Sequence, residues 1–117
     1  MAKIKDFTDL SVWRRSHGVV LEIYRITKTF PSEEKFGLVR QMRRAAVSVP
    51  ANIAEGFRKK GKKDKANFYN IAQGSLEEVR YYLILAEDLG CSKTNDELRS
   101  NIEEINRMLY GLIESLK

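Results

Sequence analysis

The chain contains few of the residues that common functional sites require. Among its 117 residues there is one cysteine, Cys91, and one histidine, His17. A disulfide within one chain is therefore excluded, and so is a zinc site of the usual cysteine and histidine type. No uncharged run approaches the roughly 18 residues of a membrane-spanning helix, and the first ten residues hold no apolar core of signal-peptide length. We therefore expect a cytoplasmic protein.

Proline and glycine are also scarce, with two and seven copies respectively. The long segments between them carry few turn signals, which favours helices over many short strands. Hydrophobic residues make up 43% of the chain, enough for one compact core. We predict a single all-α domain spanning residues 1–117.

Apolar residues recur in steps of three and four, which is typical of helices packed on one face. Short connections between such helices imply an antiparallel, up-down-up-down four-helix bundle. We predict helices over residues 9–28, 32–57, 64–89 and about 94–116.

Residues at the helix ends refine these bounds. Ser32 is a favourable N-cap for the second helix, Asp64 can cap the third, and Gly90 suits the left-handed position after its end. The fourth helix is expected to begin near Thr94 or Asn95. The inward stripe of the first helix includes His17, which we therefore interpret as a buried or interface residue rather than a catalyst.

Pro50 falls inside the second helix, where it removes a backbone donor and clashes with the preceding turn. The apolar pattern nevertheless continues past it, so we predict a kink rather than an end. A hydrogen-bonded polar cluster that supports this kink is a better interpretation than an active site. We assign Ser48, Asn52, Glu55 and Ser75 to that cluster, with Gly56 directly after it.

Positive charge is concentrated in one stretch. The chain carries a net charge of +5, but residues 40–65 alone carry +7 and the remainder −2. We predict that these cations gather at one end of the bundle and bind an anionic partner, with nucleic acid ahead of a membrane surface. Such binding would rely on backbone phosphates and be sensitive to salt. The alternative is a solvated segment that aids solubility. The nine basic residues are Arg40, Arg43, Arg44, Arg58, Lys59, Lys60, Lys62, Lys63 and Lys65.

Other signals near this charge are weaker. Phe57, Phe68 and Tyr69 could stack on unpaired bases, although packing in the core or between subunits is the preferred interpretation. Residues 56–63 nearly match a phosphate-binding loop, but Lys63 replaces the hydroxyl that would hold magnesium and a helix precedes the loop. Nucleotide hydrolysis is therefore rejected.

The third helix contains six consecutive apolar residues, from Tyr81 to Ala86. A run of this length is apolar on all sides, whereas a helix in an isolated bundle keeps one face in water. We predict self-association through this segment; the alternative is a few harmless exposed apolar groups. The expected interface residues are Tyr81, Tyr82, Ile84 and Leu85.

The sequence also resembles a known family. The run from Gln41 to Gly56 reads QMRRAAVSVPANIAEG, preceded by Phe30-Pro31 and followed by Leu89-Gly90. These motifs resemble the four-helix bundle family named for the 23S rRNA intervening-sequence protein. The resemblance implies an antiparallel bundle assembled as a homopentameric ring with a central channel. It also implies kinship with the accessory variability determinant of diversity-generating retroelements, a basic pentamer whose expected partners are nucleic acid and a reverse transcriptase.

Together these observations predict a non-enzymatic, basic, oligomeric accessory protein without cofactors or metals. It would bind RNA or DNA without sequence specificity. The alternative is a protein–protein interaction scaffold, such as a reverse transcriptase accessory subunit, with no direct role in nucleic-acid binding.

Overall fold

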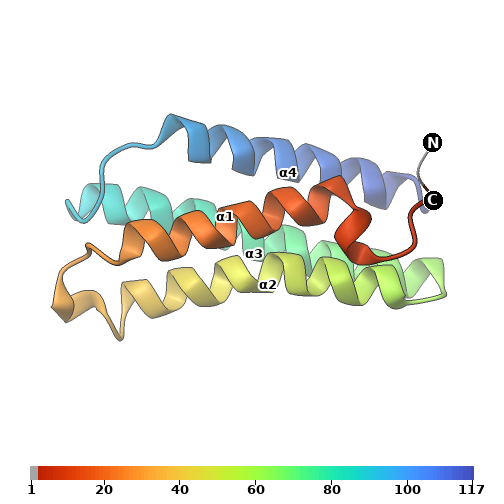
Figure 1. The fold of residues 1–117 in the computed structure, drawn as a ribbon, viewed down its shortest axis with the longest axis horizontal. Coiled ribbons are helices and arrows are strands. Elements are labelled where there is room, and N and C mark those ends of the chain that lie inside the picture. The colour runs from red at the N-terminus through yellow and green to blue at the C-terminus, as the bar shows by residue number, and fades with distance from the viewer. Residues whose placement is uncertain (1–2) are drawn as a thin grey trace.

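Four long α-helices lie side by side along the major axis of the molecule (Figure 1). The computed structural model describes residues 3–117, and no strand occurs within them. The predicted all-helical, four-helix architecture is confirmed. The connections α1–α2 and α3–α4 lie at one end, whereas the α2–α3 turn, the first described residues and the C-terminus lie at the other (Figure 1). The elements are η1 (Phe7–Asp9), α1 (Ser11–Thr27), η2 (Ser32–Glu34), α2 (Leu38–Arg58), α3 (Lys62–Asp88) and α4 (Asp96–Glu114).

Two helices begin at residues other than those predicted. Ser32 does not cap α2, because it opens the short 3-10 turn η2 and the chain leaves helical geometry again at Gly37, the N-cap of α2. Asp64 is not the cap of α3 either. Gly61 holds that position in an extended conformation, so Asp64 lies in the first turn of the helix.

The end of α3 predicted at Gly90 and the start of α4 predicted near Asn95 are both present. Gly90 has a φ of +75°, and the backbone N–H of Cys91 donates to the carbonyl of Ala86 at 2.8 Å. This left-handed cap satisfies carbonyls that the end of α3 would otherwise leave free. The side chain of Asn95 accepts a hydrogen bond from the N–H of Leu98 at 3.0 Å and so caps α4.

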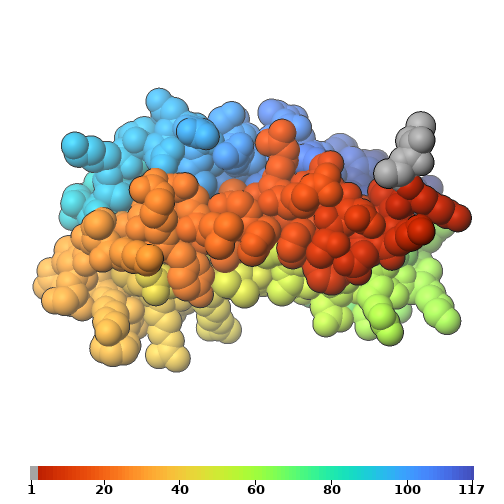
Figure 2. Space-filling view, in the orientation of Figure 1, coloured from red at the N-terminus to blue at the C-terminus, as the bar shows by residue number. Residues whose placement is uncertain are grey.

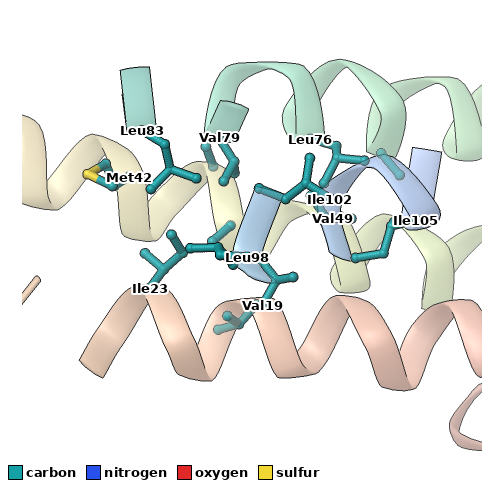
Figure 3. Close-up of a cluster of buried hydrophobic side chains, with 14 of the residues drawn as sticks. Val19, Ile23, Met42, Val49, Leu76, Val79, Leu83, Leu98, Ile102 and Ile105 are labelled. Carbon is teal, nitrogen blue, oxygen red and sulfur yellow. The ribbon is translucent and has the colours of Figure 1, made fainter. Parts of the chain in front are cut away.

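The core is formed by aliphatic side chains from all four helices, among them Ile23, Met42, Val79 and Ile105 (Figure 3). The inward stripe predicted for α1 is wrong in part. His17 is exposed and stacks on the ring of Trp13 with centroids 5.1 Å apart. The predicted stripe followed large aromatic side chains, whereas the helix buries the smaller row beside them. That row comprises Val12, Ser16, Val19, Val20, Ile23 and Thr27.

The polar cluster beside Pro50 joins α2 to α3. The hydroxyls of Ser48 and Ser75 lie 2.8 Å apart, and the amide of Asn52 donates to the Ser48 carbonyl at 2.7 Å. Glu55, predicted to belong to this cluster, is exposed instead, and it makes none of the cluster's hydrogen bonds. The helix continues through Pro50 to Arg58; a bend of its axis there stays a prediction.

Helices α2 and α3 form the tightest pair in the bundle, and Gly56 shows how closely they approach. A Cβ atom at this position would lie 2.6 Å from Cε1 of Tyr69 and 3.1 Å from Cβ of Phe68. The Tyr69 ring is only 3% exposed, so it has little room to move. The absence of a side chain at Gly56 is therefore what allows the two helices to pack here.

We expect Gly56→Ala to lower the free energy of unfolding by about 1–2 kcal/mol, because overpacking outweighs the gain in helix propensity. Chemical denaturation of both proteins measures this difference. The matched control is Gly18→Ala, since a Cβ at Gly18 meets nothing within 4 Å. That variant should gain about 0.5–1 kcal/mol. A Gly56→Ala protein as stable as the Gly18→Ala protein would contradict the packing argument.

Candidate nucleic-acid interface

The nine predicted cations lie in two groups, at opposite ends of the bundle. Arg40 lies near the start of α2 and Arg58 is its last residue, so a rise of 1.5 Å per residue places them about 27 Å apart. The prediction that all nine gather at one end is therefore wrong. Figure 2 shows side chains projecting from both regions, the orange-yellow start of α2 and the yellow-green segment around the α2–α3 turn.

The first group, here called the turn cluster, surrounds the α2–α3 connection. Only three residues separate the two helices, which crowds six basic side chains around the turn. Lys62 and Lys63 open α3, where free backbone N–H groups and the helix dipole add positive potential. The turn cluster consists of Arg58, Lys59, Lys60, Lys62, Lys63 and Lys65.

Two lysines of the turn cluster have structural contacts. Lys65 Nζ donates to the carbonyl of Phe57 at 2.7 Å and to that of Gly56 at 3.3 Å, at the carbonyl end of α2. Lys59 Nζ lies 5.2 Å from the ring centroid of Phe68. These contacts hold the turn together, and they leave Arg58, Lys60, Lys62 and Lys63 exposed.

The aromatic residues of this end are packed into the structure. Phe57 and Phe68 are half-buried, and the cations of Lys65 and Lys59 lie near their rings. Tyr69 is buried, and this burial raises the pKa of its hydroxyl. The geometry thus matches the packing interpretation of these three residues rather than base stacking.

The second group, here called the groove cluster, lies at the start of α2. The guanidinium of Arg43 sits 4.5 Å from the ring centroid of Tyr24, and its Nε donates to Thr27 Oγ1 at 3.0 Å. Arg43 therefore ties α2 to α1. Arg40 and Arg44 are exposed and lie one helical turn apart. Lys35 joins these three arginines from the segment just before α2.

These cations surround a shallow groove of about 540 Å³. Four of the lining residues are basic and none is acidic. Phe36 is 79% exposed, the highest exposure of any large hydrophobic residue in the described chain. Sequence reasoning missed it because Phe36 was assigned to the second helix; the only signal was the adjacent Gly37. The lining is Tyr24, Lys35, Phe36, Val39, Arg40, Arg43, Arg44 and Val47.

The nine cations lack carboxylate partners within the described chain. Among residues 3–117, no ion pair involves any member of the nine. Of the twelve basic residues elsewhere in the described chain, five pair with carboxylates and seven do not. The paired residues are Arg25, Arg80, Arg99, Arg107 and Lys117. Close ion pairs with the same chain therefore neutralise none of the cations in either cluster.

The predicted oligomer surface on α3 is partly open to solvent. Tyr81 is 57% exposed and Ile84 is 40% exposed, whereas Tyr82 and Leu85 are half-buried against the core. The intervening Leu83 points into the core (Figure 3). A single bundle thus covers only part of the apolar run.

Within the described residues, no three His, Cys, Asp or Glu side chains gather where a metal ion could be held. No helix over the same range is long and apolar enough to cross a bilayer.

Comparison with known proteins agrees with this architecture. A sequence model described as the 23S rRNA-intervening sequence protein matches residues 8–111. The chain belongs to this family. The match includes α1, α2 and α3 and most of α4, so the family pattern covers the whole bundle. No curated protein gave a significant match.

A solved structure shares the family's fold. It is a protein of unknown function from the S23 ribosomal protein family of Bacteroides thetaiotaomicron, 27% identical to this chain with a TM-score of 0.80. The alignment covers 87% of this chain and 97% of that one. The family and its four-helix fold are thereby established, and functional assignment depends on the chemistry of the surface.

Proposed function

We propose that this family member is a non-enzymatic, oligomeric accessory protein that binds nucleic acid through backbone phosphates. The observation that carries the proposal is the gathering of nine cations into two clusters, in neither of which a cation is paired with a carboxylate of the described chain. Unpaired cations retain their field for an external anion. The family's name, which refers to an insertion in 23S rRNA, makes RNA a natural first ligand to test.

The two clusters would contact a polyanion at separate points. Cations about 27 Å apart along α2 suit a long strand that runs along the helix rather than a small anion held at one end. Assembly through α3 would repeat both clusters around the ring axis. The family resemblance implies five copies, and we propose that number here.

We expect the affinity of the protein for RNA or DNA to fall steeply with salt, because each phosphate contact releases bound counterions. Fluorescence anisotropy with labelled oligonucleotides measures this. A complex with six phosphate contacts should lose about three orders of magnitude in affinity between about 50 and 200 mM salt. Absence of binding at the lower salt concentration, or a salt-independent affinity, would contradict the proposal.

A second function is favoured by the exposed apolar residues of α3. Tyr81 and Ile84 offer a surface on which a protein partner, such as a reverse transcriptase, could dock instead of another copy of this chain. Under this proposal the protein is a scaffold. A stable heterologous complex isolated without nucleic acid, together with no oligonucleotide binding at low salt, would favour it.

A further inference from the structure

We infer that the groove at the start of α2 binds one unpaired nucleotide of a single-stranded segment, with its base on Phe36 and its phosphate between Arg40 and Arg44. The inference rests on the proposed function. It adds that the bound nucleic acid is single-stranded and that a base stacks on Phe36.

Packing within the bundle does not explain the exposure of Phe36. It lies between η2 and Gly37, where the chain turns into α2, and its ring is 79% exposed. The nearest cation, Lys35 Nζ, is 5.6 Å from the ring centroid. A flat aromatic surface that remains this exposed beside cations is the combination that single-strand-binding proteins use.

The groove around Phe36 has a fixed wall and two free cations. Arg43 is held by Tyr24 and Thr27, so it shapes the groove without reorganising. Arg40 and Arg44 project from the same side of α2 one turn apart, and within the described chain neither is paired with a carboxylate. Guanidinium groups in such a pair are well suited to phosphate oxygens.

The size and charge of the groove favour a nucleotide over a second copy of the chain as its occupant. The volume of about 540 Å³ lies within the range of small-ligand pockets. A two-fold contact between two copies of this groove would bring eight cations together without a carboxylate among the lining residues, which is unfavourable. In a ring, a different face of a neighbouring copy would meet the groove instead, and the oligomer mass of the Phe36→Ala variant tests that alternative. A nucleotide instead presents a π face and an anionic phosphate in one unit, whatever its base.

The same geometry favours single strands over duplexes. In a duplex the base faces are covered by their neighbours, so only phosphates are available to this groove. An unstacked base of a loop or single strand can lie on the Phe36 ring. Duplex binding would then use the cations alone and gain nothing from Phe36.

The test compares labelled oligo(dT) with a hairpin duplex of equal phosphate number in anisotropy titrations. We expect Phe36→Ala to weaken single-strand binding by about five- to 150-fold, the range that base stacking on an aromatic residue provides. Duplex binding should change by less than about twofold. Phe36→Trp should retain single-strand affinity because it keeps the aromatic face.

The matched control is Tyr110→Ala, which removes a ring with 62% exposure from α4. It should leave both affinities unchanged. Equal effects of Phe36→Ala on the affinities for the two oligonucleotides, or no effect on either affinity, would overturn the inference. Salt-sensitive binding by the parent protein would still leave the proposed function in place. A change in oligomer mass on Phe36→Ala would assign the groove to a subunit contact and would also overturn it. Failure of the parent to bind either oligonucleotide would refute the proposed function itself.

Discussion

Replacing the four exposed cations of the turn cluster by glutamine is expected to weaken RNA or DNA binding by about 10²- to 10³-fold at low salt. Each lost phosphate contact should also lower the slope of log affinity against log salt by about one. Lys59 and Lys65 are left intact because they contact Phe68 and the end of α2. Anisotropy titrations over a salt series measure both quantities. The substituted residues are Arg58, Lys60, Lys62 and Lys63.

The control must remove the same charge from other places. Neutralising four cations that are paired with carboxylates, Arg25, Arg80, Arg107 and Lys117, gives the same change in net charge. If only net charge mattered, the two quadruple variants would bind equally weakly. We expect the control to lose much less affinity, because its cations were already partly compensated within the chain. Equal losses would remove the turn cluster as a site.

Much of the fold could be predicted because its signals are local. Gly90 and Asn95 fix the α3–α4 connection through hydrogen bonds within a few residues of themselves, and such caps depend little on tertiary structure. The four helices follow from apolar spacing alone. The family motif between Gln41 and Gly56 also corresponds to real contacts. Ser48 hydrogen-bonds to Ser75 of α3, Asn52 donates to Ser48, and Gly56 lies against the side chains of α3.

The wrong predictions concern the buried face of α1 and the start of α2, where two different structures fit nearly the same local sequence pattern. In α1, an aromatic row with Trp13 and His17 runs beside the aliphatic row with Val19 and Ile23. Both have helical spacing, and only close packing against three other helices selects the smaller side chains. At the start of α2, Ser32 and Glu34 do begin a helical turn, but it is a 3-10 turn that ends before Gly37.

The prediction that all nine cations lie at one end of the bundle was wrong because it did not take the length of α2 into account. The nine basic residues all fall within residues 40–65, but residues 45–57 contain none of them, and this gap forms the middle of α2. Because α2 spans the length of the molecule (Figure 1), its first and last basic residues must separate. Phe36 was not predicted as a site residue because its exposure depends on the break in the helix before α2. The spacing of apolar residues did not reveal this break.

The second large effect is expected at α3, where Tyr81→Glu combined with Ile84→Glu should convert the proposed oligomer to a monomer of 13.5 kDa. Both side chains are exposed in a single bundle, so the fold should survive. In an assembled ring each subunit contributes to two contacts, and burying unpaired carboxylates there costs several kcal/mol per ion. Light scattering after size-exclusion chromatography measures the mass, and circular dichroism confirms the helices.

Leu21→Glu combined with Tyr110→Glu is the matched control, because these residues are 58% and 62% exposed on α1 and α4. It adds the same charge and should leave the mass unchanged. A monomeric parent, or equal dissociation of both double variants, would refute assembly through α3. The monomer should also bind nucleic acid more weakly, since it loses the multivalency of repeated clusters. The turn-cluster variant, in contrast, should lose binding and keep its mass, so the two experiments separate assembly from phosphate contact.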